Sequence, residues 1–443
     1  MEFRLSTDVM RNFLVRYLGL NRAVVFSLLH KSWQAGAGLL GLVLIGLYFA
    51  PEVQGFYYTF ASLVALQSFV ELGLYLVISN AASHEWSRLR LAADGGIDGD
   101  PQALSRLVSL GRFVFKWYAV AALLFCVLAG AGGYWFLASA HTPGIRWQGP
   151  WLLHVAFSAL MLWCAPFLSL LERREQVEPV ARFRLWQVMA GNGAFWVAIV
   201  AGADLWAAPV LSAVSAAICM YYLVVCRRSF FRPFFHSPAL AGMNWRLEIL
   251  PMQWRLAVQG VLNYFVFSLF TPVMFHYHGP VVAGQMGMSL QLVNALHAIS
   301  SIWMLTKAPR FGVLIARREF ALLDLEWWQA ARRTIYMMLL GVLLMLSSLY
   351  LMTWLRYGLV ERVLPPSALL LLAVGAVFSL AAQNFSVYLR AHKKEVLMTV
   401  GMVSGVLMGL LVWQLGAHFG PVGASASYML VMTVVTFPMA LVI

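Results

Sequence analysis

Long apolar runs alternate with short polar connections along almost the whole chain. Most runs are about 20 residues long or more, the length an α-helix needs to cross a hydrocarbon core of about 30 Å. Twelve runs are expected to form membrane-spanning helices, at residues 23–49, 56–82, 109–138, 151–171, 184–202, 205–225, 253–276, 280–306, 334–354, 365–389, 395–416 and 419–441. The pattern predicts an all-α polytopic membrane protein.

The composition supports a membrane location. Of the 443 residues, 61% are hydrophobic and 11% are charged, and the mean hydropathy is +0.77. Soluble proteins carry about 25% charged residues, so the soluble class is excluded. The four cysteines lie in or beside predicted spans without metal-type spacing, and we expect neither a disulfide framework nor a metal site.

The net charge of +13 follows from the predicted topology. Basic residues gather in alternate loops, whereas the loops of the other side carry only Arg146, Arg356 and Arg362. Because basic residues favour the cytoplasmic side, both termini are expected to be cytoplasmic, and no nucleic-acid partner is needed to explain the charge. Residues 1–22 form a basic, amphipathic segment expected to lie along the inner interface, and no secretory signal is evident.

A short motif, Pro-x-Val-x-Gly, occurs as PEVQG at residues 51–55 and as PVVAG at residues 280–284. Each copy precedes the second helix of a group of six, where proline suits the first turn and glycine permits close packing. This position predicts two six-helix lobes, parallel repeats around a central cavity, as in many transporters. The expected boundaries are an N-lobe at 23–226, a cytoplasmic linker at 227–252 and a C-lobe at 253–443.

The sequence offers little enzyme chemistry. It contains no Gly-rich loop ending in Gly-Lys-Ser/Thr, and the AGAGG run at 129–133 is expected to serve helix packing. His276 and His278 are two residues apart and so point to different helix faces, which disfavours a metal site. The outer loops are too short for a catalytic domain, and we predict that the protein is not an enzyme.

Charged and amide side chains inside apolar spans are the strongest functional candidates, because they are costly in lipid. Lys31 lies roughly 13 Å into the first span, on one stripe with Gln34. Three interpretations stay open for Lys31: it binds an anionic headgroup such as a pyrophosphate, it forms an ion pair with Glu71 in the next span, or its side chain snorkels to the membrane interface.

Three further groups are candidate cavity residues. Arg255, Gln259 and Asn263 follow each other by four residues along the seventh span. Gln291 and Asn294 lie in the eighth span, and their amides suit sugar hydroxyl groups as well as they suit contacts between helices. Arg112 and Lys116 in the third span either extend a basic vestibule or follow from the positive-inside distribution.

The chain resembles the O-antigen type oligosaccharide and lipopolysaccharide flippases of the multidrug/oligosaccharidyl-lipid/polysaccharide exporter superfamily. The resemblance is carried by YFAPEVQGFYYTFASL, by FVELGLYLVISNAASHE with its acidic-Leu-Gly-Leu pattern from Glu71, and by GPVVAGQMGMSLQLVNALHAISSIWMLTKAPRFG. It implies two lobes that open alternately to each side, with cationic residues such as Lys31 and Arg255 in the cavity.

The resemblance implies a lipid-linked oligosaccharide as substrate, an isoprenoid-pyrophosphate carrier turned from the inner to the outer leaflet. A bacterial inner membrane, polysaccharide biosynthesis, and partnership with a polymerase and glycosyltransferases are implied with it. No cofactor is expected, although transport is expected to draw on a proton or sodium gradient, on the membrane potential, or on consumption of the product outside.

Three alternatives remain open from the sequence. A cation-coupled multidrug exporter of the same superfamily needs embedded carboxylates, and Glu71 is the clear mid-span acid. A membrane polysaccharide polymerase or ligase needs a larger outer face than these loops provide. A scaffold for a biosynthetic complex is the third.

Overall fold

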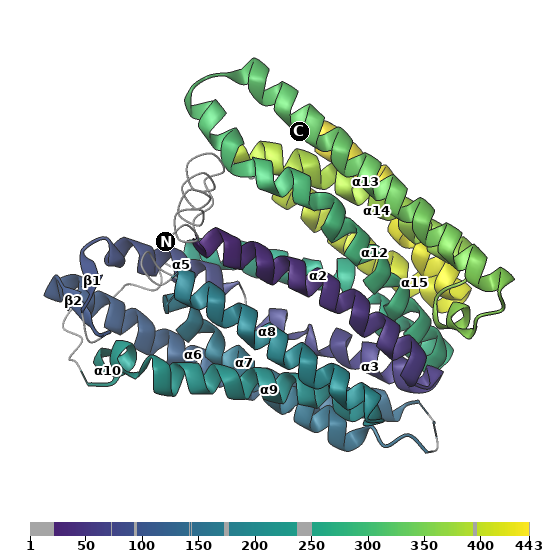
Figure 1. The fold of residues 1–443 in the computed structure, drawn as a ribbon, viewed down its shortest axis with the longest axis horizontal. Coiled ribbons are helices and arrows are strands. Elements are labelled where there is room, and N and C mark those ends of the chain that lie inside the picture. The colour runs from purple at the N-terminus through teal and green to yellow at the C-terminus, as the bar shows by residue number, and fades with distance from the viewer. Residues whose placement is uncertain are drawn as a thin grey trace, which may run out of the picture.

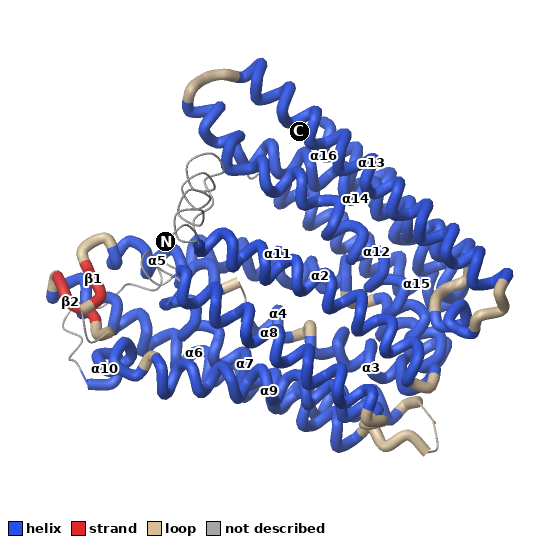
Figure 2. Tube along the Cα trace, in the orientation of Figure 1, coloured by secondary structure: helices blue, strands red, loops and turns tan. Residues whose placement is uncertain are grey.

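The computed structural model describes residues 22–71, 73–92, 95–140, 142, 144–171, 177–236, 250–392 and 397–442. Helices dominate these ranges, and a small hairpin of β1 and β2 is the sheet within them (Figure 2). The predicted amphipathic segment 1–22 lies outside the described residues except for Arg22.

The first half contains α2 (Arg22–Tyr48), α3 (Pro51–Val64), α4 (Gln67–Glu71), α5 (Leu74–Trp86), β1 (Leu89–Leu91), β2 (Ile97–Gly99), α6 (Pro101–Ala138), α7 (Gln148–Leu171), α8 (Val177–Val200), η2 (Asp204–Trp206), α9 (Ala207–Tyr221), η3 (Tyr222–Cys226) and α10 (Arg228–His236). The second half contains α11 (Leu250–Phe267), α12 (Phe270–Ala316), α13 (Phe320–Trp354), η5 (Gly358–Arg362), α14 (Pro366–Ala391), α15 (Leu397–Leu430), η6 (Val431–Thr436) and α16 (Phe437–Val442).

These elements form two lobes that diverge from one shared end (Figure 1). In the N-lobe, α2 packs on α8, α8 on α9, and α7 on both α6 and α9. In the C-lobe, α12 packs on α13 and α14, and α15 packs on α11 and α14. The prediction of an all-α polytopic membrane protein with two lobes is confirmed.

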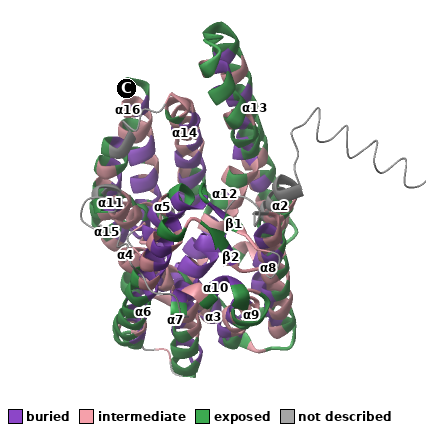
Figure 3. Ribbon diagram, turned by 90° about the vertical axis from the view of Figure 1, so that its left-hand side faces the viewer, coloured by how far each residue is buried: buried purple, intermediate pink, exposed green. Residues whose placement is uncertain are grey.

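Seven helices among the described residues are long and apolar enough to cross a membrane. Two of these segments, Leu256–Ala316 and Thr399–Val442, each contain two of the predicted spans because the chain reverses inside them. The outer faces of the lobes are apolar: on α13, the exposed fractions of Leu343, Leu344 and Tyr350 are 61%, 60% and 76% (Figure 3). Such a surface is suited to lipid rather than to water.

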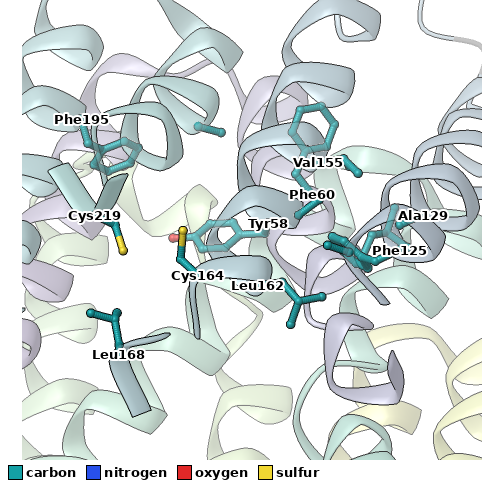
Figure 4. Packing of buried hydrophobic residues seen from close by; sticks show 14 of the residues in the cluster. Tyr58, Phe60, Phe125, Ala129, Val155, Leu162, Cys164, Leu168, Phe195 and Cys219 are labelled. Carbon is teal, nitrogen blue, oxygen red and sulfur yellow. The ribbon is translucent and has the colours of Figure 1, made fainter. Parts of the chain in front are cut away.

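The interior of the N-lobe is a continuous apolar core. Figure 4 shows part of it, where Phe60 of α3, Phe125 of α6 and Val155 of α7 belong to one cluster of buried side chains. Trp151 of α7 is fully buried, and its indole Nε1 donates to the carbonyl oxygen of Gly130 at 3.2 Å. This core holds α6, α7 and α3 in fixed positions relative to each other.

The second predicted span differs from expectation. Residues 56–82 were expected to form one helix, but the structure has three pieces, α3, α4 and α5. Gly73 adopts φ 67°, a left-handed conformation that breaks the helix, and a Cβ there would lie 2.5 Å from the Cβ of Leu256 on α11. The glycine of the acidic-Leu-Gly-Leu pattern therefore provides both a break and a close contact between the lobes.

Two Gly-Pro pairs reverse the chain in the C-lobe. Gly279 has φ 84° and ψ 175°, and Gly420 has φ 61° and ψ −143°, each directly before a proline that starts the next helix. Nε2 of His278 lies 2.8 Å from the carbonyl oxygen of Gly416, so the two reversals pack on each other. Glycine is needed here because other residues are strained in this region of φ and ψ.

Replacing Gly279 with alanine is expected to lower the stability of the protein in detergent by about 1–3 kcal/mol, because the backbone conformation is one that essentially only glycine adopts. No neighbouring atom lies within 4 Å of a Cβ built at Gly279, so the expected loss comes from the backbone alone. Thermal unfolding in a mild detergent measures it. The matched control is Gly312→Ala in the helical part of α12, also without neighbours within 4 Å, which is expected to leave stability equal or slightly higher. Equal melting of the two variants would contradict the prediction.

Candidate functional site

One close contact between the lobes lies where the two Pro-x-Val-x-Gly motifs face each other. A Cβ added at Gly55 on α3 would fall on the carbonyl oxygen of Pro280 on α12, and a Cβ added at Gly284 would lie 2.9 Å from the backbone nitrogen of Gly55. Gly287, one turn later on α12, accommodates the side chain of Tyr58 in the same way. Small residues thus bring two membrane helices into backbone contact, one from each lobe.

Gln54 stabilises this contact with hydrogen bonds. Its side chain is 1% exposed, and Nε2 donates to the carbonyl oxygens of Gly284 at 2.9 Å and Arg362 at 3.0 Å. Both acceptors belong to the C-lobe, so these bonds exist only while the lobes are in contact here. A buried amide without partners is costly, and the bonds therefore stabilise the closed contact. We call this contact, formed by Gln54, Gly55, Pro280, Gly284 and Gly287, the α3–α12 seal.

A cavity of about 260 Å³ lies among α2, α3, α8 and α9 of the N-lobe, and Gln291 of α12 reaches it from the C-lobe. Its wall combines amide, aromatic and aliphatic side chains, from Gln34, Ala37, Gly38, Gly41, Ile45, Tyr57, Val188, Asn192, Phe195, Leu211 and Gln291. Two of the predicted residues, Gln34 of the N-lobe and Gln291 of the C-lobe, are therefore brought together. Nε2 of Gln291 donates to the carbonyl oxygen of Gly38 at 3.3 Å, which links α12 to α2.

Further predicted amides lie on α12 and α11, two C-lobe helices that contact the N-lobe. Asn294 is exposed and lies three residues beyond Gln291, on the same side of α12. On α11, Gln259 and Asn263 are exposed. The neighbouring face of α11 contacts the N-lobe, where Leu256 lies against Gly73 and Tyr264 packs on Phe69 of α4. Three more predicted amides thus flank the lobe interface.

The predicted cations at the interface are placed by their backbone alone. Lys31 lies in α2, one turn before Gln34, and Arg255 lies in α11, one turn before Gln259; their side chains are outside the described part of the structure. Glu71 ends α4, which packs on α6 and α11, and its carboxyl group faces the hydroxyl group of Tyr118 on α6. The Lys31–Glu71 ion pair stays a prediction.

Arg112 and Lys116 lie apart from these residues. Nε of Arg112 donates to the carbonyl oxygen of Phe234 on α10 at 2.6 Å. Lys116 is exposed and lines a groove whose other described residues belong to the N-lobe or to α10 in the segment that follows it. The structure does not bring this pair to the cavity that Gln34 and Gln291 line.

Two polar residues of this cavity are not among the candidates from the sequence, Asn192 on α8 and Tyr57 on α3. Asn192 stands between two glycines in an otherwise apolar run, and that isolated amide was the available signal. Tyr57 stacks on Phe195 with ring centroids 5.6 Å apart, and Trp33 packs on Trp196 at 5.8 Å. Flat apolar rings beside amides form a surface that suits a sugar better than a compact ion.

No protein-family model matches the chain, and no curated protein matches it by sequence. Solved structures match its fold. The lipid II flippase MurJ in an inward closed conformation superposes with a TM-score of 0.67 at 11% identity, over 95% of this chain and 87% of that one. An inward-facing multidrug resistance MATE family transporter gives 0.59 at 13% identity, over 94% and 93%.

A transporter of the MOP superfamily from Pyrococcus furiosus gives a TM-score of 0.51 at 13% identity, over 95% of this chain and 94% of that one. All three structures are transporters, and two of their descriptions name the MOP superfamily. The chain therefore has the fold of these multi-pass transporters.

Proposed function

We propose that the protein is a flippase that moves an isoprenoid-pyrophosphate-linked oligosaccharide from the inner to the outer leaflet by alternating access. The observation that carries this proposal is the cavity lined by α2, α3, α8, α9 and Gln291 of α12, where Gln34, Asn192 and Gln291 place amides beside the rings of Tyr57 and Phe195. Amides bind sugar hydroxyl groups, and aromatic rings cover the apolar faces of sugars.

The arrangement of the lobes supports alternating access. The α3–α12 seal closes one end, and the lobes diverge from it toward the end that carries β1, β2 and α10 (Figure 1). That second end carries the basic loops, so by the positive-inside rule it faces the cytoplasm, as do both termini. The conformation is then inward-facing, and the saccharide enters from the inner leaflet while the lipid tail stays in the bilayer.

Transport needs no covalent chemistry by the protein. The loaded carrier shifts the equilibrium between the two facing states by the difference of its affinities for them. Net movement outward draws on an ion gradient, on the membrane potential, or on consumption of the product by a polymerase. The proposed setting is the inner membrane of a bacterium, where glycosyltransferases supply the lipid-linked oligosaccharide for lipopolysaccharide or related polysaccharides.

A flipping assay tests the function. The protein is reconstituted in phosphatidylcholine vesicles with an isoprenoid-pyrophosphate oligosaccharide whose sugar carries a fluorophore, and flipping is read as loss of quenching by an impermeant quencher. The native protein is expected to move the lipid, and Gln34→Leu/Gln291→Leu is expected to reduce the initial rate about 30-fold, because two amide hydrogen bonds of about 1 kcal/mol each are lost. The control is Gln102→Leu, an exposed amide at the start of α6.

A multidrug exporter is the alternative with a specific observation behind it, the partly buried carboxyl group of Glu71 and the fold shared with MATE transporters. The same vesicles loaded with a fluorescent organic cation distinguish the two. Movement of the cation without movement of the lipid-linked sugar would overturn the flippase proposal, and so would equal sugar flipping by the native protein and the double variant.

A further inference from the structure

A second cavity lies on the N-lobe, away from the C-lobe. It is a groove of about 1080 Å³ between α6, α7, α9, η3 and α10, and its described lining residues belong to the N-lobe or to α10, which lies in the segment 227–252 after it. The floor is apolar and aromatic, with Trp163, Phe167 and Phe231 among its residues. Three cations, Lys116, Arg228 and Arg232, line it as well, and no carboxylate is among the described residues of the wall.

The position of the cations along α6 and η3 indicates where the groove lies relative to the membrane surface. On α6, the exposed side chains after Lys116 are apolar, with Val120 58%, Leu123 65% and Leu124 49% exposed. On η3, Val224 and Val225 are 57% and 58% exposed, just before Arg228. Both helices therefore change from lipid-facing apolar surface to positive charge at the groove. Trp117, 37% exposed, stands at the same boundary, as aromatic residues do at the headgroup level.

The helix that closes the groove is firmly attached. α10 buries Phe230, Phe231 and Phe234, whose exposed fractions are 2%, 5% and 1%. Nε of Arg112 holds the carbonyl group of Phe234, and Phe115 of α6 stacks on Phe167 of α7 with centroids 3.8 Å apart. The groove is thus a formed feature of the N-lobe rather than a gap between loosely placed helices.

We propose that this groove binds one anionic glycerophospholipid of the surrounding leaflet, which the protein holds and does not transport. The phosphate lies among Lys116, Arg228 and Arg232, and an acyl chain lies along the aromatic floor beside Val224 and Val225. Charge complementarity selects the headgroup, because three cations at headgroup depth attract anionic lipids over zwitterionic ones. The site is separate from the cavity at Gln34 and Gln291, so it stands whether or not the proposed cargo is right.

Lipid titration of the purified protein tests this site. The protein in a neutral detergent is titrated with phosphatidylglycerol or with phosphatidylcholine of the same acyl chains, and bound lipids are counted by native mass spectrometry. Lys116→Ala/Arg228→Ala is expected to weaken the tightest phosphatidylglycerol binding about 30-fold, since each cation near the surface contributes about fivefold. Binding of phosphatidylcholine is expected to be weaker throughout and to change little.

Two further variants separate the site from general surface charge and from misfolding. Ala119→Trp keeps every cation but places an indole ring in the groove beside Lys116, and it is expected to weaken phosphatidylglycerol binding as well. Lys116→Arg/Arg228→Lys keeps the charges and is expected to bind as the native protein does, which shows that the alanine variant lost charge and not fold. The control Arg317→Ala/Arg332→Ala removes two exposed cations of the C-lobe. Equal binding of the two lipids by the native protein, an equal loss in this control, or undiminished binding by Ala119→Trp would each overturn the proposal.

Discussion

Leucine in place of Gly55 is expected to abolish transport while both lobes stay folded. A Cβ at this position would collide with the carbonyl group of Pro280 and lie 2.9 Å from the Cα of Pro280, and backbone atoms cannot rotate aside as a flexible side chain does. Overpacking of this kind costs about 1–3 kcal/mol or more. Parting of the lobes at the α3–α12 seal relieves that strain, so the population shifts about 100-fold toward the parted state, and a cycle that needs both states stops.

The shift is measured by the distance between spin labels at Trp135→Cys on α6 and Tyr350→Cys on α13, after the native cysteines are replaced. Both positions are exposed, at 80% and 76%, and they lie on different lobes near the C-terminal ends of α6 and α13. Gly55→Leu is expected to lengthen this distance and to stop flipping. Gly132→Leu on α6, where a Cβ has no neighbour within 4 Å, is expected to change neither. A Gly55→Leu variant with the native distance and the native flipping rate would contradict the prediction.

The architecture could be predicted from the sequence because a helix that crosses a lipid bilayer must be long and mostly apolar. A span must be mostly apolar where it crosses the hydrocarbon core, so the run at 151–171 corresponds closely to α7, and the run at 109–138 corresponds to α6 without its first eight residues. Pro51 is found in the first turn of α3, as its position before an apolar run predicts. The break at Gly73 was not predicted, because a single glycine in an apolar run is also compatible with a continuous helix.

The contact of the two motifs shows what a pattern leaves out. The matching positions of the motifs predict two equivalent helices, but they do not predict whether these helices contact each other. The structure shows that Gly55 lies against Pro280, so the two glycine motifs serve one contact. Equivalence is a property of the sequence, whereas contact depends on how the lobes are placed relative to each other.

Candidate residues from the sequence lie in two different cavities, for a similar reason. Gln34 and Gln291 share one cavity, yet Lys116, selected by the same reasoning as Lys31, lies in the groove beside α10. A polar residue in an apolar span has an unfavourable free energy in lipid, but the sequence alone does not show which neighbour compensates for it. Lipid headgroups, a partner helix and a cargo cavity all offset it.

Lys31→Ala is expected to lower the apparent affinity for the lipid-linked oligosaccharide about 100-fold, and Glu71→Ala is not expected to restore it. Bonds to a charged group contribute about 1.5–3 kcal/mol, and a pyrophosphate accepts several of them. The backbone of Lys31 lies one turn from Gln34, which lines the cavity. Glu71 instead lies on α4 with its carboxyl group facing Tyr118, and α2 packs mainly on α8. These placements favour a lysine that meets substrate over one that neutralises Glu71.

Flipping is measured as a function of substrate concentration in phosphatidylcholine vesicles for the native protein, Lys31→Ala and Lys31→Ala/Glu71→Ala. Arg332→Ala, which removes an exposed cation on α13, controls for net charge and is expected to stay within about twofold of the native protein. A higher concentration for half-maximal flipping in both Lys31 variants places the lysine on the substrate path. Recovery in the double variant would show instead that Lys31 mainly neutralises Glu71, because removal of both charges would then cancel the cost of one unpaired charge in the membrane.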